Sequence, residues 1–97
     1  MAGERMGIEI DRGSAVPPYE QVRTELTARI RRGELPVGTR LPTVRALADE
    51  LGLAVNTVAR VYRELEAAGL VRTQGRAGTF VHTDDAATAA AQAAAHA

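Results

Sequence analysis

The 97-residue sequence predicts an α+β fold in which three helices are followed by a small antiparallel sheet. Apolar residues recur every three or four positions in three segments between residues 19 and 68, which is the spacing of one helical face. A glycine follows each segment, at Gly33, Gly52 and Gly69. Two short runs of alternating polarity then flank residues 74–77, which indicates a β-hairpin.

The first helix is predicted to start at the proline pair of residues 17 and 18, because proline is well tolerated at a first helical position. Its apolar face consists of Tyr19, Val22, Leu26 and Ile30. The helix is expected to stop at Gly33. Before it, residues 1–16 form a polar leader in which Ile8 and Ile10 alternate with acidic residues, the pattern of a short strand.

A second helix is predicted over residues 44–51, with Thr43 as its cap and Gly52 at its end. A third helix is expected over about residues 55–68. The side chains predicted to face the core are Val44, Leu47, Ala48 and Leu51 in the second helix, and Val58, Val61 or Tyr62, and Leu65 in the third. Two helices joined by a tight glycine-containing turn form a helix-turn-helix.

Residues 70–73 and 78–82 are predicted to be the two strands of the hairpin, and residues 39–41 can pair weakly with them. Residues 17–82 are therefore expected to form a winged helix-turn-helix with a two- to three-stranded antiparallel wing. Residues 83–97 make a short Ala-rich C-terminal tail. For this tail the composition favours a marginal helix or a disordered end over a small dimer-contact helix.

Composition argues against several classes of protein. The sequence contains no cysteine, which excludes disulfides and thiolate metal sites. It shows neither a signal peptide nor a run of membrane-spanning length, so we expect cytoplasmic residence and no membrane partner. A single serine, two histidines and the solvated acidic pair Asp49–Glu50 offer no catalytic arrangement. We therefore expect no enzyme activity, no cofactor and no metal site.

The charge distribution is more informative than the formal net charge of zero. Every basic residue that is charged at neutral pH is arginine, and residues 40–83 hold six arginines against four acidic residues. Arginine suits bidentate contact with phosphates and with guanine edges. The excess is too small to identify a nucleic-acid partner by itself.

Several separated motifs occur in a familiar order. They are the Gly-x-Leu-x-x-Gly-x-x-Leu-Pro-x-x-Arg stretch of residues 33–45, Asn-Thr-Val at 56–58, Tyr-Arg-x-Leu-Glu at 62–66, Gly-Leu-Val at 69–71 and Gly-Thr-Phe-Val at 78–81. Over roughly residues 8–82 the chain resembles the N-terminal winged-helix domain of GntR-family bacterial transcription regulators. The run Asn-Thr-Val-Ala-Arg-Val-Tyr and the short C-terminal extension are most similar to the YtrA subfamily.

The resemblance implies a dimeric regulator, usually a repressor, that often controls neighbouring transporter genes. Larger relatives carry a ligand-sensing domain after the wing. Only fifteen residues follow His82 here, so we expect no effector pocket of that kind, and a small-molecule effector remains unknown.

In a helix-turn-helix, the leading residues of the second helix of the motif meet base edges. Here these residues are Val55, Asn56, Thr57 and, one turn on, Arg60. Many family members have arginine at the positions of Val55 and Ala59, so guanine contacts from those two positions are not expected. Asn56 can pair with adenine or cap the helix. Thr57 can bond a phosphate or touch a thymine methyl, and Arg60 can reach the backbone or a guanine.

The first helix of the motif carries Arg45, and the resemblance implies that this residue contacts phosphate or the groove edge. Thr43, at the start of the same helix, is a further candidate contact. The alternative for Arg45 is a solvated charge or an ion pair with Glu50. Arg63 and Arg72 are open between DNA contact and surface roles, since Arg63 can pair with Glu64 or Glu66.

The wing adds three candidates. Gly75 permits positive φ and close approach of the backbone to phosphate. Arg76, at the tip, would enter the minor groove, where narrow A·T tracts attract arginine. Thr79 is a plausible phosphate ligand at the start of the returning strand.

We therefore expect sequence-specific binding to double-stranded DNA by a homodimer. Two third helices would enter successive major grooves about 34 Å apart, which requires an inverted-repeat operator. Two alternatives stay open. The chain can be the DNA-reading fragment of a larger GntR- or MocR-type regulator, or a winged-helix protein-interaction module that does not bind DNA.

Overall fold

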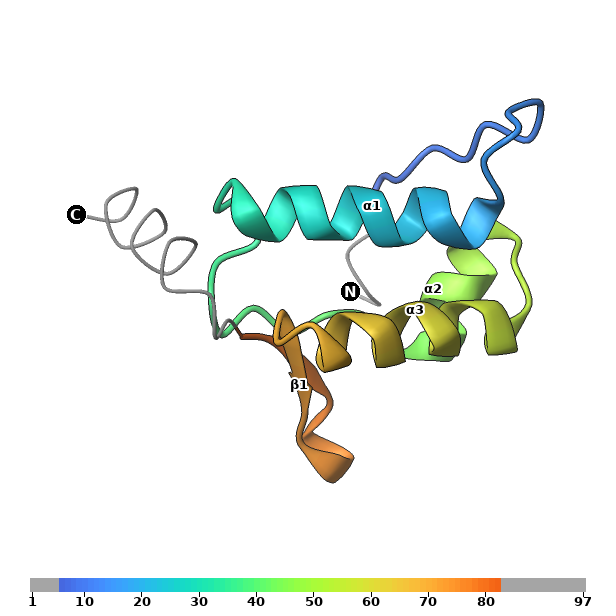
Figure 1. Cartoon of the computed structure of the whole chain (residues 1–97). Coiled ribbons are helices and arrows are strands. Elements are labelled where there is room, and N and C mark those ends of the chain that lie inside the picture. The colour runs from blue at the N-terminus through green and yellow to red at the C-terminus, as the bar shows by residue number, and fades with distance from the viewer. Residues whose placement is uncertain (1–5, 83–97) are drawn as a thin grey trace.

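The computed structural model describes residues 6–82 and shows three helices followed by a hairpin (Figure 1). The elements are α1 (Pro18–Arg31), α2 (Val44–Leu51), α3 (Val55–Ala67), β1 (Val71–Thr73), a short 3-10 turn (Gly75–Ala77) and β2 (Thr79–Val81). This arrangement confirms the predicted winged helix-turn-helix. The alanine-rich tail lies outside the described residues. None of the described helices has the length and apolar character that crossing a membrane requires.

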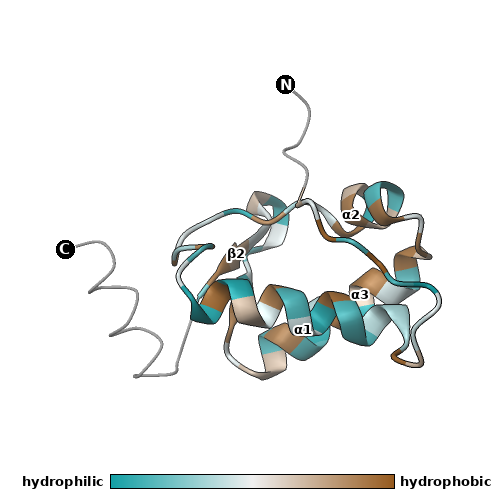
Figure 2. Cartoon of the chain, turned by 90° about the horizontal axis from the view of Figure 1, so that it is seen from above, coloured by the Kyte–Doolittle hydropathy of each residue, from teal (hydrophilic) through white to brown (hydrophobic). Residues whose placement is uncertain are grey.

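Helix α1 lies across the domain and supplies one wall of the core (Figure 1). It starts at Pro18, as the proline pair predicts, and buries Val22, Leu26 and Ile30 completely. In Figure 2, apolar and polar residues alternate along α1 and α3, as expected for helices with one buried side.

Helix α2 has the predicted bounds because both ends are specified locally. The Thr43 hydroxyl accepts a hydrogen bond from the Ala46 amide at 3.0 Å, which caps the N-terminus. Gly52 ends the helix in the left-handed conformation with φ of 67°. Between them, the buried side chains are Leu47, Ala48 and Leu51, and Val44 is partly buried against the core.

Helix α3 ends at Ala67, one residue before the predicted end, and buries one side along its whole length. Both Val61 and Tyr62 are buried, although the sequence left a choice between them. The Tyr62 hydroxyl donates a hydrogen bond to the Pro42 carbonyl at 2.7 Å. This bond connects α3 to the segment that leads into α2, and therefore restrains the angle between the two helices.

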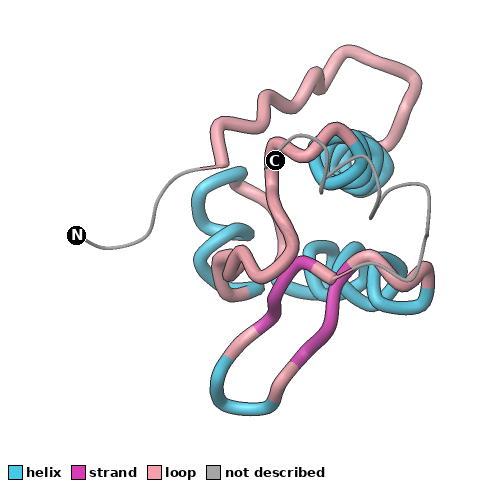
Figure 3. The backbone as a smooth tube through the Cα atoms, turned by 90° about the vertical axis from the view of Figure 1, so that its left-hand side faces the viewer, coloured by secondary structure: helices cyan, strands magenta, loops and turns pink. Residues whose placement is uncertain are grey.

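The wing is a two-stranded antiparallel sheet with Val71 opposite Val81, Arg72 opposite Phe80 and Thr73 opposite Thr79. Residues 39–41 pair with the free edge of β2, as predicted. The pairing consists of an Arg40–Phe80 bridge and hydrogen bonds that join Leu41 to Thr79 and Thr39 to Val81, each at 2.8 Å. Val71 and Val81 anchor the base of the wing in the core, and the rest of the hairpin projects away from the helices (Figure 3).

The predicted strand around Ile8 and Ile10 does not form. Residues 6–16 are instead an irregular segment in which several backbone amides donate hydrogen bonds to side chains. Glu50 accepts hydrogen bonds from the Met6 and Gly7 amides, each at 3.1 Å, and Ile8 is buried. Glu50 is therefore not the solvated charge that the sequence predicts, because it secures the leader to α2.

Replacement of Tyr62 by phenylalanine should lower the free energy of unfolding by about 1 kcal/mol, because the partly buried Pro42 carbonyl loses its donor. Urea unfolding measures this change.

Comparison of the wild type with Tyr62→Phe also tests the titration of the Tyr62 phenol. Burial, followed by the charge of Glu50, raises the pKa of Tyr62 above its ordinary value. A raised folded-state pKa gives stability that is present below about pH 10 and is lost at higher pH. The stability of the wild type should therefore fall more steeply than that of Tyr62→Phe above pH 10. If the wild type and Tyr62→Phe have equal urea unfolding midpoints at neutral pH, the hydrogen bond between Tyr62 and Pro42 does not stabilise the fold.

Candidate nucleic-acid interface

The leading end of α3 is exposed. Val55 and Asn56 both face solvent, with Val55 43% exposed, and Thr57 is half-buried. The cap position is occupied by Ala54, and no side chain caps the helix. Asn56 is therefore not the N-cap, which was one of its two predicted roles. Among the described residues, its side chain has no hydrogen-bond partner.

An open groove lies beside this end, between α2 and the start of α3. It is lined by Thr43, Arg45, Ala46, Ala48, Asp49, Leu53 and Val55. Two predicted contact residues, the α2 cap Thr43 and Arg45 of α2, thus share one groove with the first residue of α3. The hydroxyl of Thr43 already accepts the capping bond, so its first role is to position α2.

Arg60 lies on the flank of α3 that faces α1. Its Nε is 2.9 Å from Glu64 Oε2, its Nη2 is 3.2 Å from the Tyr19 hydroxyl, and its guanidinium lies 4.0 Å from the centroid of the Tyr19 ring. The hydrogen bond with Glu64 is the largest cause of a raised Arg60 pKa. Arg60 follows Asn56 by one helical turn, but these contacts direct its guanidinium toward α1.

A stripe along α3 runs from Asn56 through Ala59 to Arg63, because residues 56, 59 and 63 follow one another at helical spacings of three and four. Neither predicted ion pair of Arg63 is present in the described part of the chain. Glu64 is 2.9 Å from Arg60 and 3.4 Å from Arg23, and Glu66 accepts a hydrogen bond from the Thr73 amide. Arg63 therefore remains available on the outer side of α3.

The tip of the wing carries an exposed arginine on a tight turn. Gly75 has φ of 53°, in the left-handed region that favours glycine, and Arg76 follows it in the 3-10 turn. Thr79 is only half-exposed, and its hydroxyl lies 3.4 Å from that of Thr73 across the two strands. Of the predicted wing contacts, Gly75 and Arg76 are thus exposed and Thr79 is less accessible.

Arg40 is a candidate that the sequence analysis missed. A Cβ atom built on Gly78 would lie 2.9 Å from Arg40 Nε, so the arginine side chain passes directly over this glycine. Gly78 also has φ of 115°, which disfavours any other residue. The expected pairing of residues 39–41 with the wing was the available signal, since it places Arg40 opposite Phe80, beside the loop that carries Arg76.

The ion pairs divide the arginines into two groups. Arg23, Arg29, Arg32 and Arg60 face carboxylates within 4.0 Å, and all of those carboxylates lie on α1, the following loop or the α1-facing side of α3. Within residues 6–82, five arginines of the helix-turn-helix and wing have guanidinium groups with no ion pair or hydrogen bond: Arg40, Arg45, Arg63, Arg72 and Arg76. The alternative Arg45–Glu50 pair is absent because Glu50 bonds the leader. Zero net charge therefore conceals several arginines without an ion pair on this face, where the exposed Asp49 lines the same groove as Arg45.

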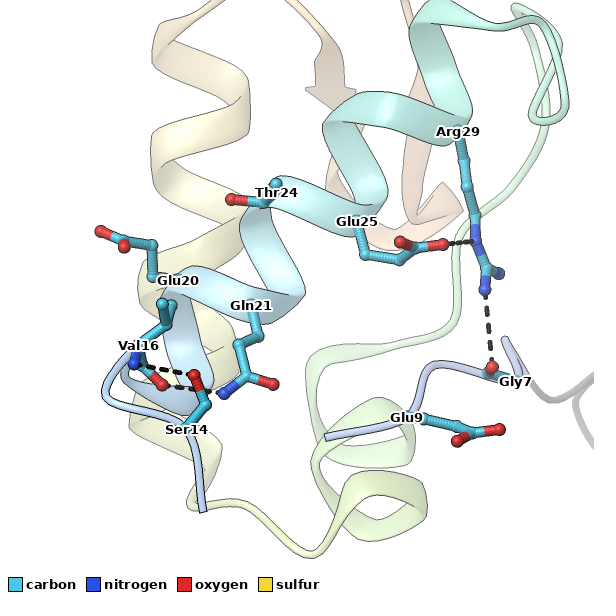
Figure 4. Close-up of a pocket in the computed structure, with 9 residues that line it drawn as sticks. All are labelled: Gly7, Glu9, Ser14, Val16, Glu20, Gln21, Thr24, Glu25 and Arg29. Carbon is cyan, nitrogen blue, oxygen red and sulfur yellow. Dashed lines mark hydrogen bonds and ion pairs between the residues drawn. The ribbon is translucent and has the colours of Figure 1, made fainter. Parts of the chain in front are cut away.

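A second groove, of about 620 Å³, lies between the leader and α1 (Figure 4). Its lining includes Glu9, Glu20 and Glu25, and its one arginine, Arg29, is bonded to Glu25. This groove is acidic and is poorly suited to a phosphate backbone, which leaves the face of α2, α3 and the wing as the candidate interface.

Comparisons with known proteins agree with this geometry. Residues 18–81 match the family described as bacterial regulatory proteins, gntR family. The chain belongs to the GntR family. It is 52% identical over 88 residues to the HTH-type transcriptional regulator Rv1152 of Mycobacterium tuberculosis, an alignment that covers 91% of this chain and 73% of the relative. It spans 57% of the transcriptional repressor YtrA of Bacillus subtilis, to which it is 36% identical over 74 residues.

Solved structures support the same assignment. YtrA from Sulfolobus acidocaldarius, a GntR-family transcription factor, superposes with a TM-score of 0.72 at 30% identity, over 92% of this chain and 77% of that one. The AraR DNA-binding domain in complex with operator ORE1 gives a TM-score of 0.64 at 28% identity, over 75% and 92% of the two chains. The chain is a winged-helix transcription regulator with a DNA-binding domain, and the predicted likeness to YtrA is confirmed.

Substitution of Thr43 by alanine should lower the free energy of unfolding by about 1 kcal/mol, because the Ala46 amide loses its cap. Thr43→Ser keeps the hydroxyl and should retain most of the stability. Urea unfolding of both variants measures the difference. If serine and alanine destabilise α2 equally, the hydroxyl does not cap the helix.

Proposed function

We propose that the chain is a homodimeric repressor that binds an inverted-repeat operator in double-stranded DNA. The observation that carries this proposal is the exposed leading end of α3, which lies beside arginines that have no carboxylate partners within residues 6–82. A helix end of this kind fits the major groove, and unpaired arginines supply the charge that phosphates require. The proposed site of action is the cytoplasm.

In this arrangement the position of each side chain determines whether it contacts bases or phosphates. Val55, Asn56 and Thr57 face the bases from the first turn of α3, while Arg45 reaches the adjacent phosphates from α2. Arg63 lies two turns along α3, on the same stripe as Asn56, where it can meet the backbone. Arg60 positions α3 through Glu64 and Tyr19 instead of touching DNA.

The wing completes the contact on the minor-groove side. Arg76 enters the groove from the turn that begins at Gly75, and Arg40, lying over Gly78, supports it with a second positive charge. Thr79 bonds a phosphate if its hydroxyl turns away from Thr73. Narrow minor grooves attract arginine because their negative potential is enhanced.

Two copies are needed to cover two half-sites. The separation of about 34 Å expected between the third helices equals one turn of B-DNA and predicts a palindromic site. Occupancy of a promoter would block the polymerase. The repressor role is supported by the similarity to YtrA of Bacillus subtilis, which is a transcriptional repressor.

Selection of bound sequences from random double-stranded DNA with the purified chain tests the proposal. Enrichment of an inverted repeat with half-sites one helical turn apart is expected, together with a two-to-one ratio of protein to duplex. Enrichment of a single half-site would overturn the dimer. Recovery of unenriched DNA would overturn sequence-specific binding.

Alanine at Arg45 or at Arg76 should weaken binding to all sequences, because each substitution removes a phosphate contact. The slope of log Kobs against log salt should become shallower by about one unit for each arginine that is replaced. Filter binding across a salt series gives the slope. The matched control is Arg31→Ala, which removes an exposed arginine at the end of α1. An unchanged slope for Arg45→Ala would remove that residue from the interface.

Alanine at Arg40 distinguishes a DNA contact from a structural role in the wing. Weaker binding with a shallower salt slope and an unchanged unfolding midpoint is expected. A lower unfolding midpoint with unchanged affinity would assign Arg40 to the stability of the wing alone.

A further inference from the structure

The leading turn of α3 presents an apolar surface to the solvent. Val55 is one of three large apolar side chains that are exposed among residues 6–82, and Ala54 before it is also exposed. Ala59 lies one turn after Val55 and faces the same direction, because residues four apart are neighbours on a helix. Packing within the domain therefore does not account for an apolar side chain at position 55.

The same turn carries no free cation. Arg60 is the only charged residue between Val55 and Val61, and it is held by Glu64 and Tyr19 on the flank that faces α1. Arg63 lies two turns from the leading end. Arginine and lysine are the principal readers of guanine in the major groove. The first turn of α3 therefore lacks the side chains that would select a G·C pair by its guanine edge.

Two polar side chains remain on this turn, and of these Thr57 is half-buried and Asn56 is exposed. Asn56 is exposed, does not cap the helix, and has no hydrogen-bond partner within residues 6–82. Its carbonyl and amino groups match the N6 donor and N7 acceptor of adenine. On either side, the methyl groups of Val55 and Ala59 match the C5-methyl group of thymine, which is the apolar feature of the major groove.

We propose that the base pairs beneath the leading turn of α3 are A·T pairs. Val55 and Ala59 recognise them by thymine methyl groups, and Asn56 recognises them by the adenine edge. The inference rests on the proposed function and adds the chemical class of the operator half-site. It concerns only the base pairs under α3. Neighbouring base pairs can still be contacted by Arg45, which lies on α2 on the other side of the groove that it shares with Val55.

Base analogues test this proposal on the site recovered by selection. The thymines under α3 are replaced by deoxyuridine, which lacks the methyl group, and binding is measured by titration of labelled duplex. Removal of each contacted methyl group should weaken binding by the wild type about three- to four-fold. Val55→Ala should discriminate less than the wild type at the thymine beneath position 55, while the methyl contact of Ala59 is retained. Val16→Ala, at an exposed valine before α1, should keep the wild-type discrimination.

The adenine contact is tested in the same way with 7-deazaadenine, which lacks the N7 acceptor. Affinity of the wild type should fall at least about five-fold, by analogy with other bidentate base contacts. Asn56→Ala should not distinguish adenine from its analogue. Since Asn56 is exposed and bonds no described residue, this variant should unfold at the same urea concentration as the wild type.

The outcomes separate this inference from the proposed function. The inference is supported if the wild type discriminates, if thymine discrimination is reduced in Val55→Ala, and if adenine discrimination is lost in Asn56→Ala. Specific binding to a site with G·C pairs under α3, or equal affinity for the thymine and deoxyuridine duplexes, overturns the inference and leaves DNA binding intact. Failure to select any site overturns both.

Discussion

The orientation of α3 is the constraint on which the rest of the structure depends. Three connections besides core packing hold the helix. The Tyr62 hydroxyl bonds the Pro42 carbonyl ahead of α2, the pair of Arg60 and Glu64 contacts α1, and Glu66 accepts a hydrogen bond from the backbone of β1 in the wing. All of these contacts lie away from the leading end. The helix is thus fixed along its length while its first turn stays free to meet a ligand.

The placement of carboxylates complements this arrangement. Glutamates form ion pairs with arginines on α1 and on the flank of α3 beside it. Glu50 instead accepts hydrogen bonds from the backbone amides of Met6 and Gly7. Acidic residues therefore pair with arginines on one side of the domain, and within residues 6–82 they leave five arginines of the helix-turn-helix and wing without an ion pair. A polyanion would be attracted to that side even though the formal charges of the whole chain cancel.

Local signals made much of the fold predictable. Thr43 and Gly52 define the two ends of α2, and the alternating apolar and polar residues on either side of residues 74–77 indicate the hairpin. The leader was predicted wrongly as a strand because its alternation reflects the burial of Ile8 against the helices, with side chains in place of a partner strand.

The candidate site was less predictable, since it depends on which charges meet across the fold. Sequence spacing cannot show that Arg60 turns toward Tyr19, because these residues are 41 positions apart. Nor can it show that Arg40 lies over Gly78. Both findings require the tertiary structure, and they move one arginine out of the proposed interface and another into it.

Amide chemical-shift mapping during titration with the selected duplex tests the central claim most directly. The account predicts the largest changes at residues 55–59, at Arg45 and in the turn around Arg76, with small changes in the leader and along the exposed side of α1. Changes centred on the acidic groove between the leader and α1, with residues 55–59 unaffected, would contradict it.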